Sequence, residues 1–302
     1  MNNSKEKKSV VLLSILATVF LIVFKLVIGL LTCSLSIISE ALNSTIDMIA
    51  SCITYFAVRL SEKPADKEHN FGHGKIENLS AFLQTILLFG SVIWIFKEAI
   101  EKLITNNHNV EITFWSFLVI ITSIVIDLSR SRKLRRVAKE NNSQAIEADA
   151  TNFTCDIISS TFVLIGLIFS YFGIPIADAI ASMFVGIMIF ILACRLGKKS
   201  VDVLLDRTPK YIPEQIHNYL KDNNIEYHSL KVRSSGADTI VTFDLHMKPD
   251  VTLTEAHNIC DKIEKDLSNI IKNIDIYIHV EPDTDEHNLT DVDDGLLQNK
   301  ID

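Results

Sequence analysis

Two short segments of this sequence place an Asn four residues before an Asp. The first pair is Asn43 and Asp47, and the second is Asn152 and Asp156. Residues i and i+4 of a helix lie on one face about one turn apart, so each pair can point into a single space. Two carboxylates and two amides supply four hard oxygen donors, which favour Mn²⁺, Mg²⁺ or Ca²⁺. A site for Zn²⁺ normally contains imidazole or thiolate.

The same residue types could instead serve helix packing, because Asn and Asp side chains also join membrane helices by hydrogen bonds. Two pairs with identical spacing, in two separate apolar segments, favour a binding site over this alternative. We therefore predict that these four side chains face one another and bind one divalent cation.

A second candidate site lies between the two Asn/Asp pairs in the sequence. Asp66, His69 and His73 combine two histidines at i and i+4 with a carboxylate three residues upstream. This spacing can form a mixed nitrogen and oxygen metal site. Solvated loop histidines are the simpler alternative.

The elements that carry these residues are apolar. Hydrophobic residues make up 48% of the 302 residues and the mean hydropathy is +0.26, which is untypical of a soluble or a disordered chain. A bilayer core needs about 20 apolar residues per helix. Six stretches meet this length approximately, and we predict six transmembrane helices at 9–31, 36–58, 79–104, 112–129, 145–172 and 175–194.

Basic residues are concentrated in alternate connections between these stretches, and the other three connections contain none. By the positive-inside rule, this alternation places both termini in the cytoplasm. We expect the membrane to be the plasma membrane of a cell. The basic residues are Lys5, Lys7, Lys8, Lys63, Lys67, Lys75, Arg130, Arg132, Lys133, Arg135, Arg136 and Lys139.

The last third of the chain differs in charge and pattern. Residues 199–302 contain 11 basic and 21 acidic residues, a net charge of −10 that argues against a nucleic-acid partner. Thr252 and Glu255 form a capping box that opens a helix, and alternation of polar and apolar residues indicates strands. We predict an α+β ferredoxin-like domain from a helix at 213–222, strands at 228–233 and 239–247, a helix to about 269, and a strand at 275–280.

This domain contains six metal-capable residues, which come together only if the sheet brings them together: His228, Asp244, His246, His257, His279 and Glu281. We divide the chain into a transmembrane domain at 1–198, a cytoplasmic domain at 199–282, and an acidic tail at 283–302 that we expect to be disordered.

Four segments resemble the cation diffusion facilitator family of divalent metal/proton antiporters: Pro64 to Glu77, Ala148 with Asp149, Leu204 to Arg207, and His279 to Pro282. The resemblance implies a homodimeric transporter whose cytoplasmic ferredoxin-like domain binds metal. It places the transport site on the two Asn/Asp pairs and a loop site on Asp66, His69 and His73. It further implies His228, His257, His279 and Glu281 as cytoplasmic ligands, and Lys75 with Asp206 as a charge pair between protomers.

The sequence departs from the pattern of that family at three positions. Zinc members typically carry Asp or His at the position of Asn43 and His at that of Asn152, and Asp244 stands where some members have His. We therefore expect Mn²⁺ as the exported ion. Asp47 and Asp156 would act as both ligands and proton carriers, because an Asn cannot release a proton. Mg²⁺ fits less well because it dehydrates reluctantly.

Three alternatives stay open at this point. The same antiporter could use Zn²⁺, Fe²⁺ or Co²⁺, since Mn²⁺ and Fe²⁺ prefer similar ligands. A membrane metal sensor without net flux would be a different class of protein, although it would not need ligands at membrane depth. An intramembrane hydrolase ranks last, because the spans contain neither HExxH nor GxSxG, and we predict that the protein is not an enzyme.

Overall fold

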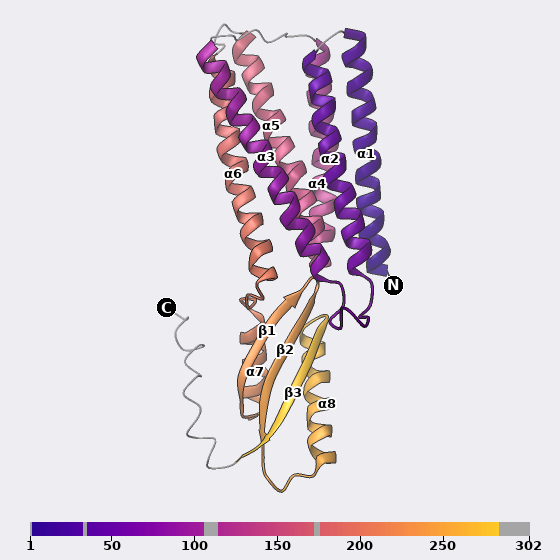
Figure 1. Cartoon of the computed structure of the whole chain (residues 1–302), viewed down its shortest axis with the longest axis vertical. Coiled ribbons are helices and arrows are strands. Elements are labelled where there is room, and N and C mark those ends of the chain that lie inside the picture. The colour runs from indigo at the N-terminus through magenta and orange to yellow at the C-terminus, as the bar shows by residue number, and fades with distance from the viewer. Residues whose placement is uncertain (1, 33–34, 106–113, 172–175, 284–302) are drawn as a thin grey trace. The chain divides into compact units, whose positions relative to one another are not determined.

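The computed structural model describes residues 2–32, 35–105, 114–171 and 176–283 (Figure 1). The chain divides into two compact units, Met1–Val201 and Asp202–Asp302. The helix that leads into the second unit runs to Leu204, so residues 199–204, which the sequence places in the predicted cytoplasmic domain, are the last residues of that helix. Of the predicted tail at 283–302, all but Asp283 lies outside the described residues.

The first unit is built from long helices (Figure 1). Within the described ranges, all of them except α5 are long and apolar enough to cross a membrane. The predicted helical membrane protein followed by a small α+β domain is confirmed. The helices are α1 (Asn2–Thr32), α2 (Leu35–Ser61), α3 (Lys75–Thr105), α4 (Phe114–Glu140), α5 (Gln144–Tyr171) and α6 (Ile176–Leu204).

These helices continue well beyond the apolar stretches, which corrects one part of the sequence interpretation. Residues 130–139 were counted as a connection, but they form the last turns of α4. Arg130 is only 7% exposed, and its guanidinium donates a hydrogen bond at 3.1 Å to Asp127, three residues earlier on the same helix. A basic residue with such a partner can stay inside a helix bundle.

A buried ionic cluster joins four segments at one end of the bundle. Glu77 of α3 is 1% exposed and accepts hydrogen bonds from Lys7 of α1 at 2.8 Å and from Ser61 of α2 at 3.0 Å. Ser143, which precedes α5, donates to the other carboxylate oxygen. Because these partners come from separate segments, the cluster links α1, α2 and α3 to the residue before α5.

The second unit is a three-stranded sheet with two helices (Figure 1). β1 and β2 are antiparallel, while β2 and β3 are parallel and are connected through α8. The predicted order of elements is confirmed, and so is the capping box, in which the Thr252 hydroxyl accepts from the Glu255 N–H. The elements are α7 (Ile212–Asp222), β1 (Tyr227–Ser235), β2 (Asp238–Met247), α8 (Leu253–Ile270) and β3 (Ile274–Pro282).

The two faces of this sheet differ in polarity. Phe243 and Leu245 of β2 are buried in one core with Ile216 of α7 and Ile263 of α8. Successive side chains of a strand point to opposite faces, so the alternate residues Thr242, Asp244 and His246 lie on the face away from that core. The sheet therefore presents its metal-capable residues together on the polar face.

Candidate metal-binding sites

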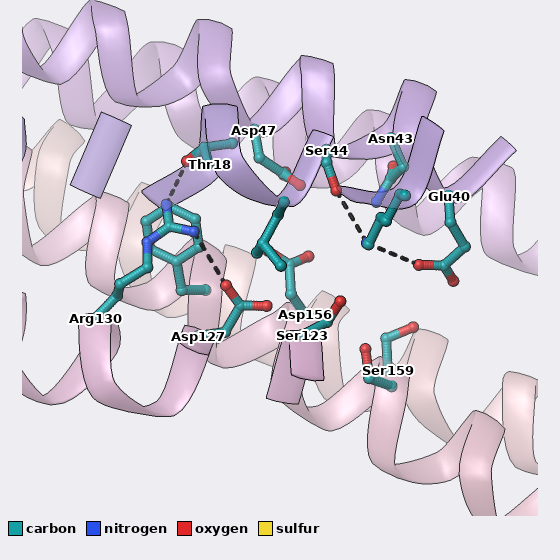
Figure 2. A pocket seen from close by; sticks show the side chains of 14 residues that line it. Thr18, Glu40, Asn43, Ser44, Asp47, Ser123, Asp127, Arg130, Asp156 and Ser159 are labelled. Carbon is teal, nitrogen blue, oxygen red and sulfur yellow. Dashed lines mark hydrogen bonds and ion pairs between the residues drawn. The ribbon is translucent and has the colours of Figure 1, made fainter. Parts of the chain in front are cut away.

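A cavity of about 50 Å³ lies between α1, α2, α4 and α5 (Figure 2). This volume has room for an ion and a few waters. The wall is mainly polar, and its residues come from segments far apart in the sequence. They are Thr18, Leu21, Lys25, Glu40, Asn43, Ser44, Asp47, Ser123, Asp127, Arg130, Phe153, Asp156, Ser159 and Ser160.

The structure brings the two Asn/Asp pairs together at this cavity. Asp47 of α2 and Asp156 of α5 both line it, and Figure 2 shows their carboxylates pointing inward. Asn43 lies one turn before Asp47 and lines the same space. Asn152 is not in the wall, but its Nδ2 donates to Asp47 Oδ1 at 3.0 Å. All four predicted side chains therefore meet at the contact between α2 and α5.

A second hydrogen bond supports this contact. Ser51 lies one turn after Asp47 on α2, and its hydroxyl donates to Asp149 Oδ1 of α5 at 2.9 Å. Both residues are 0% exposed. The two hydrogen bonds hold α2 against α5 at successive turns. The sequence interpretation did not include Ser51, although it continues the four-residue spacing of Asn43 and Asp47.

The cavity also contains charged residues that the sequence interpretation missed as site residues. Lys25 of α1 contacts Glu40 Oε2 at 3.0 Å, and Arg130 of α4 contacts Asp127 Oδ1 at 3.1 Å. Single charges inside apolar stretches usually face a partner or a cavity, and that signal could have identified Lys25 and Asp127. Arg130 was missed because it had been assigned to a connection.

The donor atoms decide which ions the cavity suits. Apart from its two basic side chains, the described wall offers carboxylate, amide and hydroxyl groups, and it contains no His, Cys or Met. Such oxygen donors favour hard divalent ions, and soft or imidazole-seeking ions gain less from them. The arrangement can hold one divalent cation between two carboxylates from opposite helices.

The three residues of the predicted loop site lie close together. Ligand atoms of Asp66, His69 and His73 lie within 4.8 Å of one another, with His73 Nε2 at 3.4 Å from Asp66 Oδ2. The backbone N–H groups of His69 and Glu68 donate to the Asp66 carboxylate and hold its pKa below the usual range. These hydrogen bonds favour the ionised carboxylate, the form that binds a cation.

The polar face of the sheet holds a third cluster. Ligand atoms of His228, Asp244 and Glu281 lie within 4.8 Å of one another. His228 Nδ1 is 2.8 Å from His246 Nε2, and its Nε2 is 3.4 Å from Asp244 Oδ2. Strand register explains the convergence, because His228 pairs with Asp244 and His246 with Glu281. Imidazole and carboxylate together suit a wider range of metals than the cavity does.

Two predicted ligands of this domain, His279 and His257, are not among the clustered residues within one chain. His279 Nε2 is 3.3 Å from Glu281 Oε1, but its side chain is 70% exposed. His257 is on α8, whose apolar residues pack on the opposite face of the sheet, and it pairs with Asp261 at 3.6 Å. Within a single chain, His257 is thus not one of the clustered ligands.

The two residues of the expected charge pair between protomers belong to different units. Lys75 is the first residue of α3. Asp206 follows α6 with a positive φ of 56°, and its carboxylate is 3.4 Å from Arg233 Nη1 of β1. The pairing of Lys75 with Asp206 stays a prediction.

Comparison with known proteins covers both units. The family model described as "Cation efflux transmembrane domain" matches residues 11–205, and "Cation efflux protein, cytoplasmic domain" matches residues 210–283. The chain belongs to the cation diffusion facilitator family. As a member of this family, it is a multi-pass membrane protein that exports divalent metal cations.

Relatives of this cation diffusion facilitator match over most of their length. The cation-efflux pump FieF of Yersinia enterocolitica is 32% identical over 274 residues, which are 89% of this chain and 90% of the relative. FieF of Cronobacter sakazakii is 29% identical over 273 residues, 88% and 90% of the two chains. A solved CzrB chain is 31% identical and covers 25% of this chain and 98% of its own, with a TM-score of 0.24.

Proposed function

We propose that this transporter exports Mn²⁺ from the cytoplasm in exchange for external protons. The observation that supports it most is the oxygen-rich cavity in which Asp47 and Asp156 face one space. Because the described wall contains neither imidazole nor sulfur, the site gives Zn²⁺ no preferred ligand. Export of Fe²⁺, Zn²⁺ or Co²⁺ by the same site is the alternative outcome.

Exchange follows from the chemistry of the four predicted ligands. The carboxylates of Asp47 and Asp156 can each neutralise part of the ion's charge or bind a proton. The amides of Asn43 and Asn152 are neutral and do not titrate, so they can contribute only an oxygen ligand. The Asn152 amide N–H donates to Asp47, and a bound cation would attract that same carboxylate. Metal and protons therefore compete for the same two carboxylates, and the amides select the ion.

Alternating access would come from rocking of one group of helices against another around this site. We place both termini and the second unit in the cytoplasm of a cell whose plasma membrane the six helices cross. The protein would act as a homodimer in the bilayer, with Lys75 of one protomer paired with Asp206 of the other. The loop cluster and the sheet cluster would hold metal as structural or regulatory ligands.

Transport by purified protein in lipid vesicles tests this function. With a pH gradient imposed across vesicles that contain a pH-sensitive dye, we expect Mn²⁺ flux to exceed that of Zn²⁺, Fe²⁺, Co²⁺ and Mg²⁺, with protons moving in the opposite direction. Asp47→Ala should remove the flux. A larger flux of another ion would overturn the choice of Mn²⁺, metal flux without proton movement would overturn the exchange, and an active Asp47→Ala protein would overturn the site.

A further inference from the structure

Two basic side chains lie in the wall of the proposed cation cavity. Lys25 is 5% exposed and Arg130 is 7% exposed, and both line the cavity (Figure 2). A buried positive charge repels a cation that binds beside it. Their presence in a site for a divalent cation therefore needs an explanation beyond helix packing.

The contacts of Arg130 keep its charge in place. Nη1 donates to Asp127 at 3.1 Å, and Nε and Nη2 donate to Ser14 of α1 at 3.2 and 3.0 Å. The guanidinium carbon lies 3.6 Å from the ring centroid of Phe153 on α5. A planar guanidinium held on three sides by α1, α4 and α5 cannot leave the wall without breaking these contacts.

Lys25 is held in a similar way on another side of the cavity. Its Nζ donates to Glu40 Oε2 and to Ser44 Oγ, both at 3.0 Å. Glu40 is the more accessible partner, since its side chain is 40% exposed, whereas that of Lys25 is 6% exposed. The pair joins α1 to α2 next to Asn43.

Counting the ionised groups of the wall shows what the two cations do. The described lining residues include four carboxyl groups, Glu40, Asp47, Asp127 and Asp156, and two basic groups, Lys25 and Arg130, so the formal net charge with every group ionised is −2. Lys25, Asp127 and Arg130 line the same cavity as both proposed ligand carboxylates, Asp47 and Asp156. One divalent cation neutralises this wall, whereas without the two cations the net charge would be −4.

We propose that Lys25 and Arg130 are built-in counter-charges that limit the cavity to one divalent cation and weaken its binding enough for release. This proposal rests on the transport site proposed above. Asp127 and Glu40 hold the two cations in place and contribute negative charge themselves. Lys25 and Arg130 are thus positioning residues for charge, because they set the field at Asp47 and Asp156 without contacting the ion.

The two partners of one ion pair should therefore change transport in opposite directions. Arg130→Met leaves a net charge of −3 and should lower the apparent KM for Mn²⁺ by about tenfold or more, together with a lower maximal rate because release slows. Asp127→Asn leaves −1 and should raise the apparent KM by a similar factor. The double variant restores −2, and its KM should fall between those of the single variants. Arg130→Lys keeps the charge and should shift the KM less than Arg130→Met.

A purely structural role would give a different pattern. Both single variants would then lose activity in the same direction, the double variant would not recover, and Arg130→Lys would resemble Arg130→Met because Lys cannot form the planar fork. Any of these results overturns the proposal. The KM is measured in vesicles with Mn²⁺, or with the ion that wild type transports fastest, and Mn²⁺ binding to detergent-solubilised protein gives a second readout that does not need flux.

Loss of one partner of a buried ion pair can also prevent folding. If Arg130→Met does not fold, Lys25→Met with Glu40→Gln provides the same test, because Glu40 already contacts solvent. Lys25→Met should lower the KM and Glu40→Gln should raise it, and shifts of both in the same direction overturn the proposal.

Asp47→Ala is measured in parallel. Activity of that variant would mean that the transport site itself is wrong, whereas an inactive Asp47→Ala with unchanged KM values in the other variants would refute only the counter-charges.

Discussion

The helix cavity and the polar face of the sheet are two ways of gathering metal-capable side chains in one chain. The cavity contains oxygen donors and two fixed cations, and it lies among α1, α2, α4 and α5. The cluster on the sheet combines His228 and His246 with Asp244 and Glu281. The cavity thus offers hard donors with a balanced charge, which suits an ion that must leave again. The sheet offers imidazole as well, which suits a metal that stays bound.

The two regions also differ in how their candidate ligands are held in position. Hydrogen bonds between α2 and α5 hold the proposed cavity ligands in place: Asn152 donates to Asp47, and Ser51 donates to Asp149 one turn away. Helices joined in this way can move against one another. The sheet ligands lie on paired strands whose other face packs on α7 and α8. A change in the cavity should therefore alter transport directly, and a change on the sheet should alter metal content first.

Removing a cavity carboxylate should have the largest effect. For Asp156→Asn we expect a loss of about 2–5 kcal/mol of ion binding, roughly 30-fold to several thousand-fold, because a buried charged partner of the cation is gone. Flux in vesicles is the measurement. Glu147→Gln is the matched control, since this carboxylate is also on α5 but pairs with Lys199 outside the cavity, and it should retain flux. Equal loss in both variants would contradict the assignment.

Replacing a cavity amide should make the cavity more like the sheet cluster. Asn152→His adds an imidazole beside Asp47 and should raise the ratio of Zn²⁺ to Mn²⁺ flux by about tenfold, which corresponds to a gain of about 1.4 kcal/mol for Zn²⁺. The ratio is read from initial rates at equal ion concentrations. An unchanged ratio in a folded, active variant would show that Asn152 does not select the ion.

Removing a ligand from the sheet cluster should affect metal content more than transport. His228→Ala should lower the number of Zn²⁺ ions bound per full-length chain, because His228 contacts Asp244, His246 and Glu281. Elemental analysis after dialysis measures this number, and flux should change only a few-fold. His217→Ala is the control, since His217 forms a hydrogen bond with Tyr227 outside the cluster. Equal metal content in both variants would exclude a metal site there.

The smallest effect should come from the N-terminal cap of α8, the helix that packs on the apolar face of the sheet. Thr252→Ala removes the hydroxyl that accepts from the Glu255 N–H and should destabilise α8 by about 1 kcal/mol, without changing flux. Hydrogen exchange of the α8 amides in the full-length protein measures this.

The cap should also depend on pH. The hydrogen bonds from Thr252 hold the pKa of the Glu255 carboxyl below its usual range. A lowered folded-state pKa stabilises the fold fully above the unfolded pKa, and this stabilisation disappears as the pH falls through the folded pKa. Protection of α8 should therefore decrease below about pH 4.5 in wild type and less so in Thr252→Ala. A parallel decrease in both proteins would contradict this role of Glu255.

Local patterns were enough to predict most elements of the fold. The apolar stretches identified the membrane helices, and the capping box and alternating residues identified the elements of the second unit, because these signals depend on neighbours within a few positions. The predicted ends of the helices were less accurate where basic residues follow the apolar stretch. α4 continues through Arg130 to Glu140, since a helix can extend beyond its apolar part when its charged side chains reach water or a partner.

The sequence by itself determined the fold class, the family resemblance and the two Asn/Asp pairs, because i,i+4 spacing fixes which side chains share a helix face. Only the tertiary structure decided that Lys25, Asp127 and Arg130 belong to the same cavity as those pairs. It also decided that His228 joins Asp244 and Glu281, while His257 lies apart from them. The physical reason is that these relations depend on helix packing and strand register, which bring together residues that no local spacing connects.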